Sequence, residues 1–254
     1  MLLTIDIGNT NITFGVFHDE ALIMRWRMAT DRAKMPDEYG MILSFLFDHN
    51  GINPSYISGV CVSSVVPQVT PKMEDAINYY IDKPFLAVNY KLKLGLKLKI
   101  DNPSEIGNDR IADAVAVKHL YGYPACLIDF GTATSFNIID SHGDYIGGAI
   151  AAGIQTSAEA LFLKTAQLPN INVQRPPHII GKNTIHSMQS GLFFGYISLF
   201  EGMVIRYKKE IGENMKVIAT GGLAAVFKKE TIMIDQVDSW LTLKGLKIVW
   251  ELNQ

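Results

Sequence analysis

The chain has 254 residues, which is enough for one large domain or for two domains of about 125 residues each. Hydrophobic residues make up 48% and charged residues 19%, so the chain can bury a full core and a disordered protein is excluded. The formal net charge is −2, from 23 basic and 25 acidic residues, and this balance gives no indication of a nucleic-acid partner.

Two features indicate the compartment. Cys61 and Cys126 both lie in apolar runs without a paired framework or metal-ligand spacing, which predicts buried thiols in a reducing compartment. The N-terminus, MLLTIDIGNT, lacks the basic region of a signal peptide, and Asp6 interrupts its apolar stretch. No stretch approaches the roughly 18 apolar residues of a membrane span. We therefore expect a cytoplasmic protein with neither a membrane nor a nucleic-acid partner.

The residue pattern in the first half of the chain predicts three strands followed by alternating helices and strands. Strands are expected at residues 2–7, 12–17, 21–28, 59–65 and 85–88, and helices at 36–50, 67–80 and about 103–120. Lys91, Lys93, Lys97 and Lys99 alternate with leucines. This pattern predicts the solvated face of a strand, which could also attract anionic substrates.

The second half begins with the same pattern. Strands are expected at 125–129, 135–139, 145–150 and 216–219, helices at 156–165, 184–210 and 241–250, and an ordered loop at 166–181. His142 lies in a predicted hairpin turn. An apolar stripe at helical spacing predicts a core face or a subunit interface; its members are Leu192, Tyr196, Leu199, Met203 and Tyr207.

An internal repeat links the two halves. Residues 3–14 (LTIDIGNTNITF) and 126–136 (CLIDFGTATSF) each place an aspartate at the end of an apolar strand, followed by a glycine turn and a second strand. Asp6 and Asp129 are 123 residues apart, close to half the chain. The repeat predicts two similar domains, each with an aspartate at a hairpin tip; the alternative is two common Asp-x-Gly turns that arose independently.

The tips have the residue types of a triphosphate site. Gly8 allows a tight turn whose N–H groups can point at phosphate oxygens, and Asp6 can hold Mg²⁺ directly or through water. Gly221-Gly222 follows a buried strand and permits the close approach of a flat ring such as adenine, although a simple strand-to-helix turn explains it equally well. The chain has neither a P-loop nor a Rossmann fingerprint.

Gly107-Asn108-Asp109-Arg110 precedes an apolar helical run. Asp109 could accept a proton from a hydroxyl group, and Arg110 could bind an anionic group. The alternative is a helix-start acid beside a surface arginine.

Together these features resemble the actin, sugar-kinase and heat-shock-chaperone ATPase superfamily, and within it the type III pantothenate kinases. The resembling segments run from end to end of the chain: DIGNTN at 6–11, DNPSEIGNDR at 101–110, DFGTATSF at 129–136, GGAIAAGI at 147–154, IGKNT at 180–184, SGLFFGY at 190–196, ATGGLA at 219–224 and LTLKGL at 241–246.

The resemblance implies an α/β fold of two ribonuclease-H-like domains, residues 1–120 and 121–254, each a mixed sheet with flanking helices, facing across a nucleotide cleft. It implies a homodimeric enzyme that phosphorylates pantothenate with ATP, the first step of coenzyme A biosynthesis. The implied cofactors are Mg²⁺ with ATP and a monovalent cation, K⁺ or NH₄⁺.

The resemblance also implies the site residues. Asp109 would be the proton acceptor, Asp129 would bind the monovalent cation, and Asp6 would hold Mg²⁺ through water. ATP would contact Asp6, Ile7, Gly8, Asn9, Thr10, Asn11, Ile12, Thr13, Thr132, Gly221 and Gly222. Pantothenate would contact Ile100, Gly107, Asn108, Asp109, Arg110 and Thr184.

Two positions depart from the family's pattern. Many members have Tyr as a pantothenate contact where this chain has Ile100, and Ala where it has Asn108. Two other hypotheses stay open: a sugar or acetate kinase or ATPase machine of the superfamily, against which the short chain argues, and a non-catalytic binding module. The presence of Asp6, Asp109 and Asp129 favours an enzyme.

Overall fold

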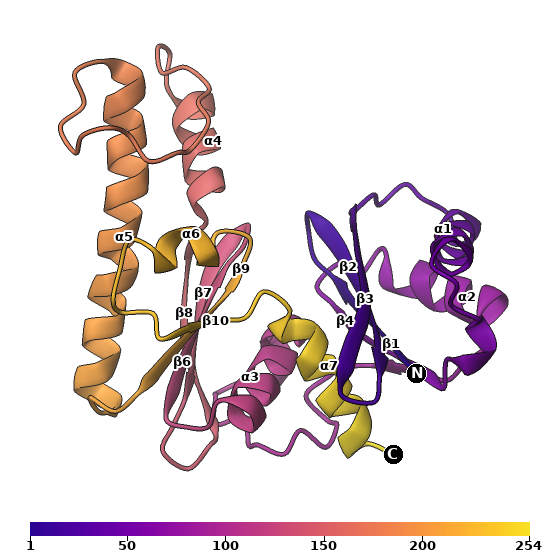
Figure 1. Ribbon diagram of the computed structural model, residues 1–254. Coiled ribbons are helices and arrows are strands. Elements are labelled where there is room, and N and C mark those ends of the chain that lie inside the picture. The colour runs from indigo at the N-terminus through magenta and orange to yellow at the C-terminus, as the bar shows by residue number, and fades with distance from the viewer. The chain divides into compact units, whose positions relative to one another are not determined.

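The computed structural model describes residues 1–254 and divides into two compact units. Unit 1 comprises Met1–His119 and Trp240–Gln254, and unit 2 comprises Leu120–Ser239 (Figure 1). The structure thus differs from the expected domains 1–120 and 121–254, because the last residues of the chain belong to unit 1. Their helix, α7 (Leu241–Leu252), contacts strands of the first sheet, where the ring of Trp250 lies against Gly59.

Unit 1 contains a five-stranded mixed sheet in the order β3-β2-β1-β4-β5. The first three strands are antiparallel, and β4 and β5 extend the sheet in parallel to β1. The strands are β1 (Leu2–Ile7), β2 (Asn11–His18), β3 (Ala21–Ala29), β4 (Gly59–Ser64) and β5 (Phe85–Ala87).

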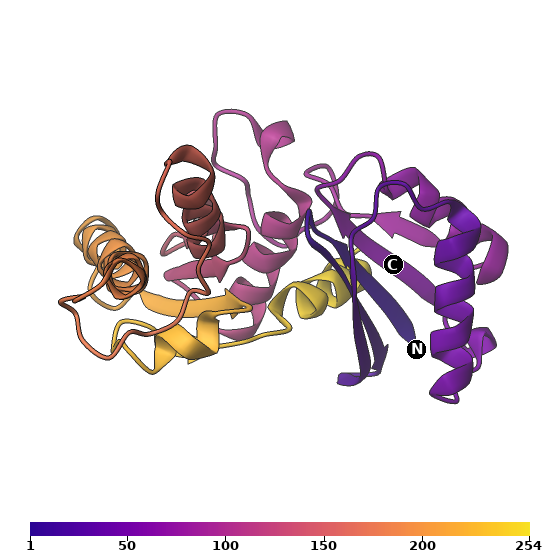
Figure 2. The same cartoon turned by 90° about the horizontal axis from the view of Figure 1, so that it is seen from above.

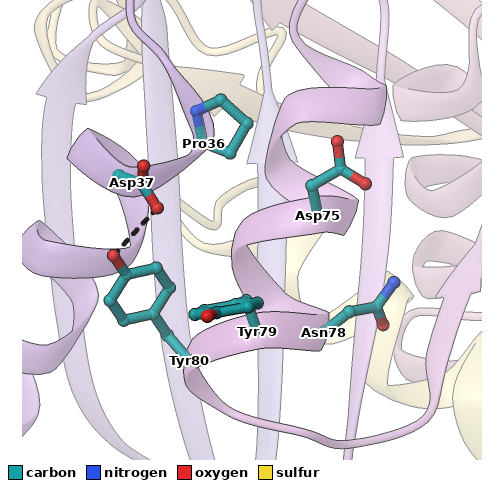
Figure 3. A pocket seen from close by; sticks show the side chains of 6 residues that line it. All are labelled: Pro36, Asp37, Asp75, Asn78, Tyr79 and Tyr80. Carbon is teal, nitrogen blue, oxygen red and sulfur yellow. Dashed lines mark hydrogen bonds between the residues drawn. The ribbon is translucent and has the colours of Figure 1, made fainter.

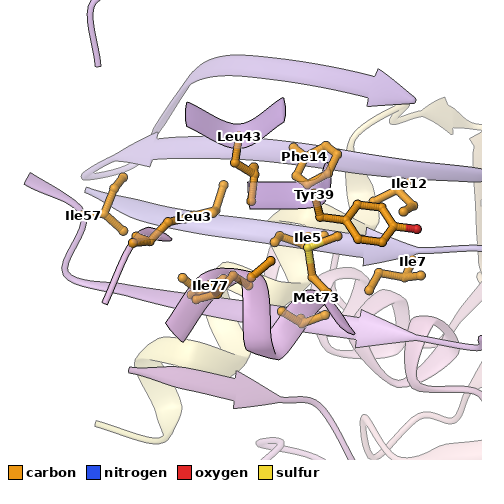
Figure 4. Packing of buried hydrophobic residues seen from close by; sticks show 14 of the residues in the cluster. Leu3, Ile5, Ile7, Ile12, Phe14, Tyr39, Leu43, Ile57, Met73 and Ile77 are labelled. Atoms are coloured by element: carbon orange, nitrogen blue, oxygen red, sulfur yellow. The ribbon is translucent and has the colours of Figure 1, made fainter. Parts of the chain in front are cut away.

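Helices cover both faces of this sheet. α1 and α2 lie on one side and α7 on the other (Figure 1). Apolar side chains of β1 and β2 point toward α1 and α2 and form a buried cluster with Leu43 and Met73 (Figure 4). The helices of unit 1 besides α7 are α1 (Pro36–His49), α2 (Thr70–Tyr80) and α3 (Asn108–Leu120), with 3-10 turns at Pro54–Tyr56 and Pro103–Glu105.

Unit 2 repeats the same sheet. Its order is β10-β9-β6-β7-β8, with β6, β7 and β8 antiparallel and β9 parallel to β6. The strands are β6 (Ala125–Phe130), β7 (Ala133–Ile139), β8 (Tyr145–Ala152), β9 (Lys216–Gly221) and β10 (Gln236–Val237). When the order is read from β8 to β10, it matches the order from β3 to β5 in unit 1. The predicted repeat is therefore confirmed, and so is the predicted fold class of two mixed sheets with flanking helices.

Three helices bury one face of the second sheet: α4 (Ile154–Lys164), α5 (Thr184–Ile211) and α6 (Ala224–Lys228). Phe130 lies at the centre of an aromatic cluster with Tyr196, Phe200 and Phe227. Figure 2 views α5 nearly along its axis and shows α6 beside it. The loop between α4 and α5 has no regular secondary structure, as predicted, and is tied to α5 by a hydrogen bond from Gln189 Nε2 to Asn172 O (3.1 Å).

Other predictions have mixed outcomes. Cys61 and Cys126 are free and buried, and burial raises the pKa of the Cys61 thiol to about 12, as expected for inert core thiols. His142 lies in the predicted turn, and the apolar stripe of α5 is largely core, although Leu199 is exposed.

The predicted strand at the lysine-rich segment is wrong. Residues 91–99 form turns and bends with a single bridge residue, although the lysines are exposed and the leucines between them are partly or fully buried as the alternation implies. The backbone N–H of Lys93 donates instead to Asn253 Oδ1 (3.0 Å), so a side chain replaces a neighbouring strand.

The expectation that no stretch is apolar enough for a membrane span is also wrong, because α5 is long enough and apolar enough to cross a membrane. An 18-residue window of α5 reaches a mean hydropathy of 1.2. In the structure 44% of that window is buried in the protein, and a core helix passes the same test.

Candidate active site

The first hairpin tip joins β1 to β2. Gly8 N–H donates to Asn11 O (3.0 Å), and a Cβ on Gly8 would lie only 3.1 Å from the same oxygen. Thr30, just after β3, supports the turn with two hydrogen bonds. Its Oγ1 donates to Gly8 O (2.6 Å), and its backbone N–H donates to Thr10 O (2.9 Å). Asn9, Thr10 and Asn11 are left exposed, which suits side chains that contact a phosphate.

Asp6 occupies the end of β1 beneath this tip. Burial raises its pKa to about 7; the nearby Asp109 carboxylate acts in the same direction, whereas a hydrogen bond from Ser63 and the charge of Arg27 act against it. Ser63 Oγ donates to Asp6 Oδ1 at 2.6 Å. A carboxylate with oxygen neighbours and a second carboxylate nearby is a suitable donor set for Mg²⁺, which typically takes one or two carboxylates and keeps several waters.

Asp109 begins α3 in the same unit. Its Oδ1 accepts the backbone N–H of Arg110 at 2.7 Å, and a Cβ on Gly107 would lie 2.5 Å from that oxygen, so the carboxylate fills the space that glycine leaves. Burial raises the pKa of Asp109, and the Arg110 backbone and charge lower it. Asn108 Nδ2 donates to Ser64 O (3.3 Å), which ties the start of α3 to the end of β4.

Unit 1 therefore brings Asp6 and Asp109 near each other, although they lie far apart in the sequence. Ile100 is half-buried in the irregular segment that leads to the 3-10 turn at Pro103–Glu105. Sequence reasoning missed Ser63, which ends a strand of valines and small residues and shows its partner only when β4 pairs with β1. The remaining predicted residues, Asp129, Thr132, Thr184, Gly221 and Gly222, belong to unit 2.

The second hairpin tip joins β6 to β7 with similar geometry. Gly131 N–H donates to Ala133 O (3.1 Å). Thr132 O accepts from Gly153 N–H (3.0 Å) and from Thr156 Oγ1 (2.8 Å), so the start of α4 fixes the backbone of the turn. Thr132 itself is exposed.

Gly221 of β9 pairs with Phe130 of β6, and the Asp129 carboxylate also lies close to it. Gly221 has a φ of +91°, and a Cβ there would lie 2.6 Å from both Asp129 Oδ1 and Phe130 O. Only glycine fits beside these two oxygen atoms, and carbonyl oxygens are donors that coordinate K⁺ in proteins. Burial and the nearby Asp129 charge both raise the pKa of Tyr196. No group of three or more His, Cys, Asp or Glu gathers as a transition-metal site.

A cavity of about 320 Å³ lies at the end of β9 in unit 2. Its apolar walls suit a flat ring, and the Arg175–Glu230 ion pair (3.1 Å) ties the loop before α5 to the residues after α6. The lining residues are Ile154, Val173, Gln174, Arg175, Phe193, Leu223, Val226, Phe227, Lys229 and Glu230.

A second hollow, of about 450 Å³, lies in unit 1 between α1 and α2 (Figure 3). The Tyr80 hydroxyl donates to Asp37 Oδ1 (3.0 Å) across it. It is lined by Pro36, Asp37, Asp75, Asn78, Tyr79 and Tyr80, and it contains none of the predicted site residues.

Two solved structures have a fold similar to that of this chain. The activator of 2-hydroxyisocaproyl-CoA dehydratase from Clostridium difficile, solved with bound ADPNP, aligns with a TM-score of 0.53 and 15% identity over 99% of this chain and 95% of that chain. A conserved protein of the Baf family from Campylobacter jejuni aligns with a TM-score of 0.63 and 19% identity over 98% and 97%. These alignments show that this chain shares its fold with both proteins.

Sequence comparison is more specific. The model of the type III pantothenate kinase family matches residues 2–206. A curated type III pantothenate kinase from Halalkalibacterium halodurans is 47% identical over 253 residues, covering 100% of both chains. This chain belongs to the type III pantothenate kinase family.

Proposed function

We propose that this protein is an ATP-dependent kinase that phosphorylates the primary hydroxyl of pantothenate, the first step of coenzyme A biosynthesis. The observation that carries the proposal is full-length similarity to curated members of the family, in a chain that keeps both carboxylates of unit 1. The pantothenate oxygen attacks the γ-phosphorus, its proton passes to Asp109, and the bond to the β–γ bridging oxygen breaks to release ADP.

Asp6 would hold the Mg²⁺ of the Mg–ATP complex through water, and the ion would supply positive charge to the phosphates. Residues 6–13 would bind phosphates with the backbone and polar side chains of the first tip. Thr132 and Gly221-Gly222, which belong to unit 2, are further proposed ATP contacts. The apolar cavity beside Leu223 is the candidate for the adenine ring, because flat apolar walls and a polar rim suit a purine.

The pantothenate contacts would be Ile100, residues 107–110 and Thr184. Arg110 offers a guanidinium to the carboxylate of the substrate. Thr184 begins α5, where Asn183 caps the helix by accepting the N–H of His186 at 2.8 Å, and the threonine is exposed. Ile100 replaces a tyrosine contact with an apolar one.

We expect activity to require a monovalent cation as well as Mg²⁺. Asp129 would bind K⁺ or NH₄⁺ in the space beside Gly221, adding positive charge where phosphate charge accumulates. ADP release measured with K⁺, NH₄⁺ or Na⁺ as the sole monovalent cation tests this. Turnover should be high with K⁺ or NH₄⁺, and full turnover with Na⁺ alone would contradict the assignment.

We also expect a homodimer whose pantothenate site combines Asp109 of one subunit with Thr184 of the other. Exposed apolar side chains on α5 and the loop before it support an interface there; they are Ile179, Ile180, Ile185, Leu199 and Ile205. Mixing inactive Asp109→Asn subunits with inactive Thr184→Val subunits should restore activity, because some mixed dimers then contain one intact site. Absence of recovery after confirmed subunit exchange would contradict a shared site.

We place the enzyme in the cytoplasm, with no nucleic-acid or membrane partner. Thermal shifts with ATP, pantothenate and glucose separate this proposal from its alternatives. Pantothenate and ATP should each raise the unfolding temperature and glucose should not. Stabilisation by glucose but not by pantothenate would indicate a sugar kinase, and nucleotide binding without any ADP release would indicate a binding module.

A further inference from the structure

A row of polar side chains crosses the sheet of unit 1 at the level of the first tip. In the strand register, Asp6 of β1 lies beside Ser63 of β4 and Thr13 of β2. Thr13 in turn lies beside Arg27 of β3. Because laterally paired residues point to the same face of a sheet, the four side chains share one face. The expected ATP contacts include Asp6 and Thr13, so the row ends in a basic side chain that no role above assigns.

The charge of Arg27 acts on the carboxylate of Asp6. The strand register places Arg27 and Asp6 on one face of the sheet, two strands apart, and the charge of Arg27 lowers the pKa of Asp6. Arg27 is nevertheless exposed and takes part in none of the ion pairs of the structure. Its N–H donors are therefore available to a ligand at the tip.

Trp240 holds the guanidinium on this face. The Arg27 Cζ atom lies 5.9 Å from the centre of the Trp240 ring, and that of Arg25 lies 4.9 Å from it. Such cation–π contacts orient a guanidinium through its flat face and leave the N–H groups at its edge free to bind anions. Trp240 directly precedes α7, which packs on the same sheet, so the ring has a rigid support.

We propose that Arg27 binds a phosphate group of the nucleotide at the first hairpin tip and that Trp240 positions its guanidinium. The proposal rests on the assignment of residues 6–13 to ATP. Two carboxylates, Asp6 and Asp109, lie on the side of the site where a polyphosphate would bind. An arginine in the same row offsets their repulsion and can donate two parallel hydrogen bonds to phosphate oxygens.

Arg25 provides a matched control. It stands two residues before Arg27 on the same strand and face, contacts the same tryptophan, and is also exposed, but its register partner is Gly15, away from the tip. Arg27→Gln should raise the KM for ATP about 10- to 100-fold, the usual loss for a charge-assisted hydrogen bond, and leave the KM for pantothenate unchanged. Arg25→Gln should leave both constants unchanged, and Arg27→Lys should recover part of the loss.

A direct binding measurement separates ligand binding from a structural role of Arg27. Calorimetric titration of ADP with Mg²⁺ should show weaker binding to Arg27→Gln but not to Arg25→Gln, at equal unfolding temperatures.

Equal effects of the two glutamine variants on ATP and ADP would overturn the proposal. So would a rise in the KM for pantothenate with the KM for ATP unchanged, because the bound anion would then be the substrate carboxylate. A wild-type protein that binds ADP through Arg27 but does not phosphorylate pantothenate would refute the proposed function and leave this inference standing.

Discussion

Replacing Asp109 with asparagine is expected to lower kcat by about 10²–10⁴-fold, the usual contribution of general acid–base catalysis. The primary hydroxyl of pantothenate is a poor nucleophile at neutral pH, so a carboxylate that accepts its proton assists attack on the γ-phosphorus. Asparagine keeps the size of the side chain, and its Oδ1 can still accept the Arg110 N–H, but it cannot take the proton.

The affinity for ATP distinguishes a catalytic role of Asp109 from a structural one. The affinity of Asp109→Asn for ATP, measured by calorimetry, should stay near that of the wild type, because Asp109 is assigned to the hydroxyl rather than to the nucleotide. If the variant retains more than about a tenth of the wild-type kcat, the base assignment is wrong and Asp109 is a helix-start acid. An effect near the low end of the range would indicate a loose transition state in which Asp109 mainly orients the hydroxyl.

Asp6→Asn is expected to damage productive nucleotide binding as well as turnover. Loss of a charge that holds Mg²⁺ should lower kcat/KM for ATP by about 10²–10³-fold, comparable to the loss of one strong electrostatic contact in a preorganised site. Steady-state kinetics at several Mg²⁺ concentrations measure this. A normal KM for ATP with an unchanged Mg²⁺ requirement would contradict the role of Asp6.

The same variant should stabilise the protein in the absence of ligand. The folded-state pKa of Asp6, about 7, lies above its ordinary value of 3.8, so the folded protein binds this proton more tightly than the unfolded chain does. Stability therefore falls as pH rises from about 4 to about 7, and an uncharged asparagine avoids that loss. The unfolding temperature of Asp6→Asn should exceed that of the wild type by a margin that grows over this pH range. A margin independent of pH would contradict the raised pKa.

Much of the architecture could be predicted because it depends on local pattern. The strands that lead to Asp6 and Asp129 are largely apolar. Each ends in an Asp-x-Gly turn and is followed by a second strand at the same spacing. The three-strand start of each half follows from these signals, and the repeat supplies the two-unit fold.

The features that sequence reasoning missed depend on contacts between distant segments. The amphipathic pattern of α7 predicts a helix but not which sheet the helix covers. In the structure α7 belongs to unit 1. The alternation of residues 91–99 predicts which side chains are buried, yet a strand needs a neighbouring strand, and here the backbone bonds to Asn253 instead. The elements α6 and β10 are too short for periodicity to detect. Likewise Ser63 and Arg27 join the site only through strand register.

The most direct test is a coupled ADP-release assay with pantothenate and ATP in the presence of Mg²⁺ and K⁺, with the product examined by ³¹P NMR. We expect pantothenate-dependent ADP release and a phosphate monoester on the primary hydroxyl, and both should form about 10²–10⁴-fold more slowly in Asp109→Asn. ADP release that is independent of pantothenate, or that occurs with glucose and not with pantothenate, would contradict it.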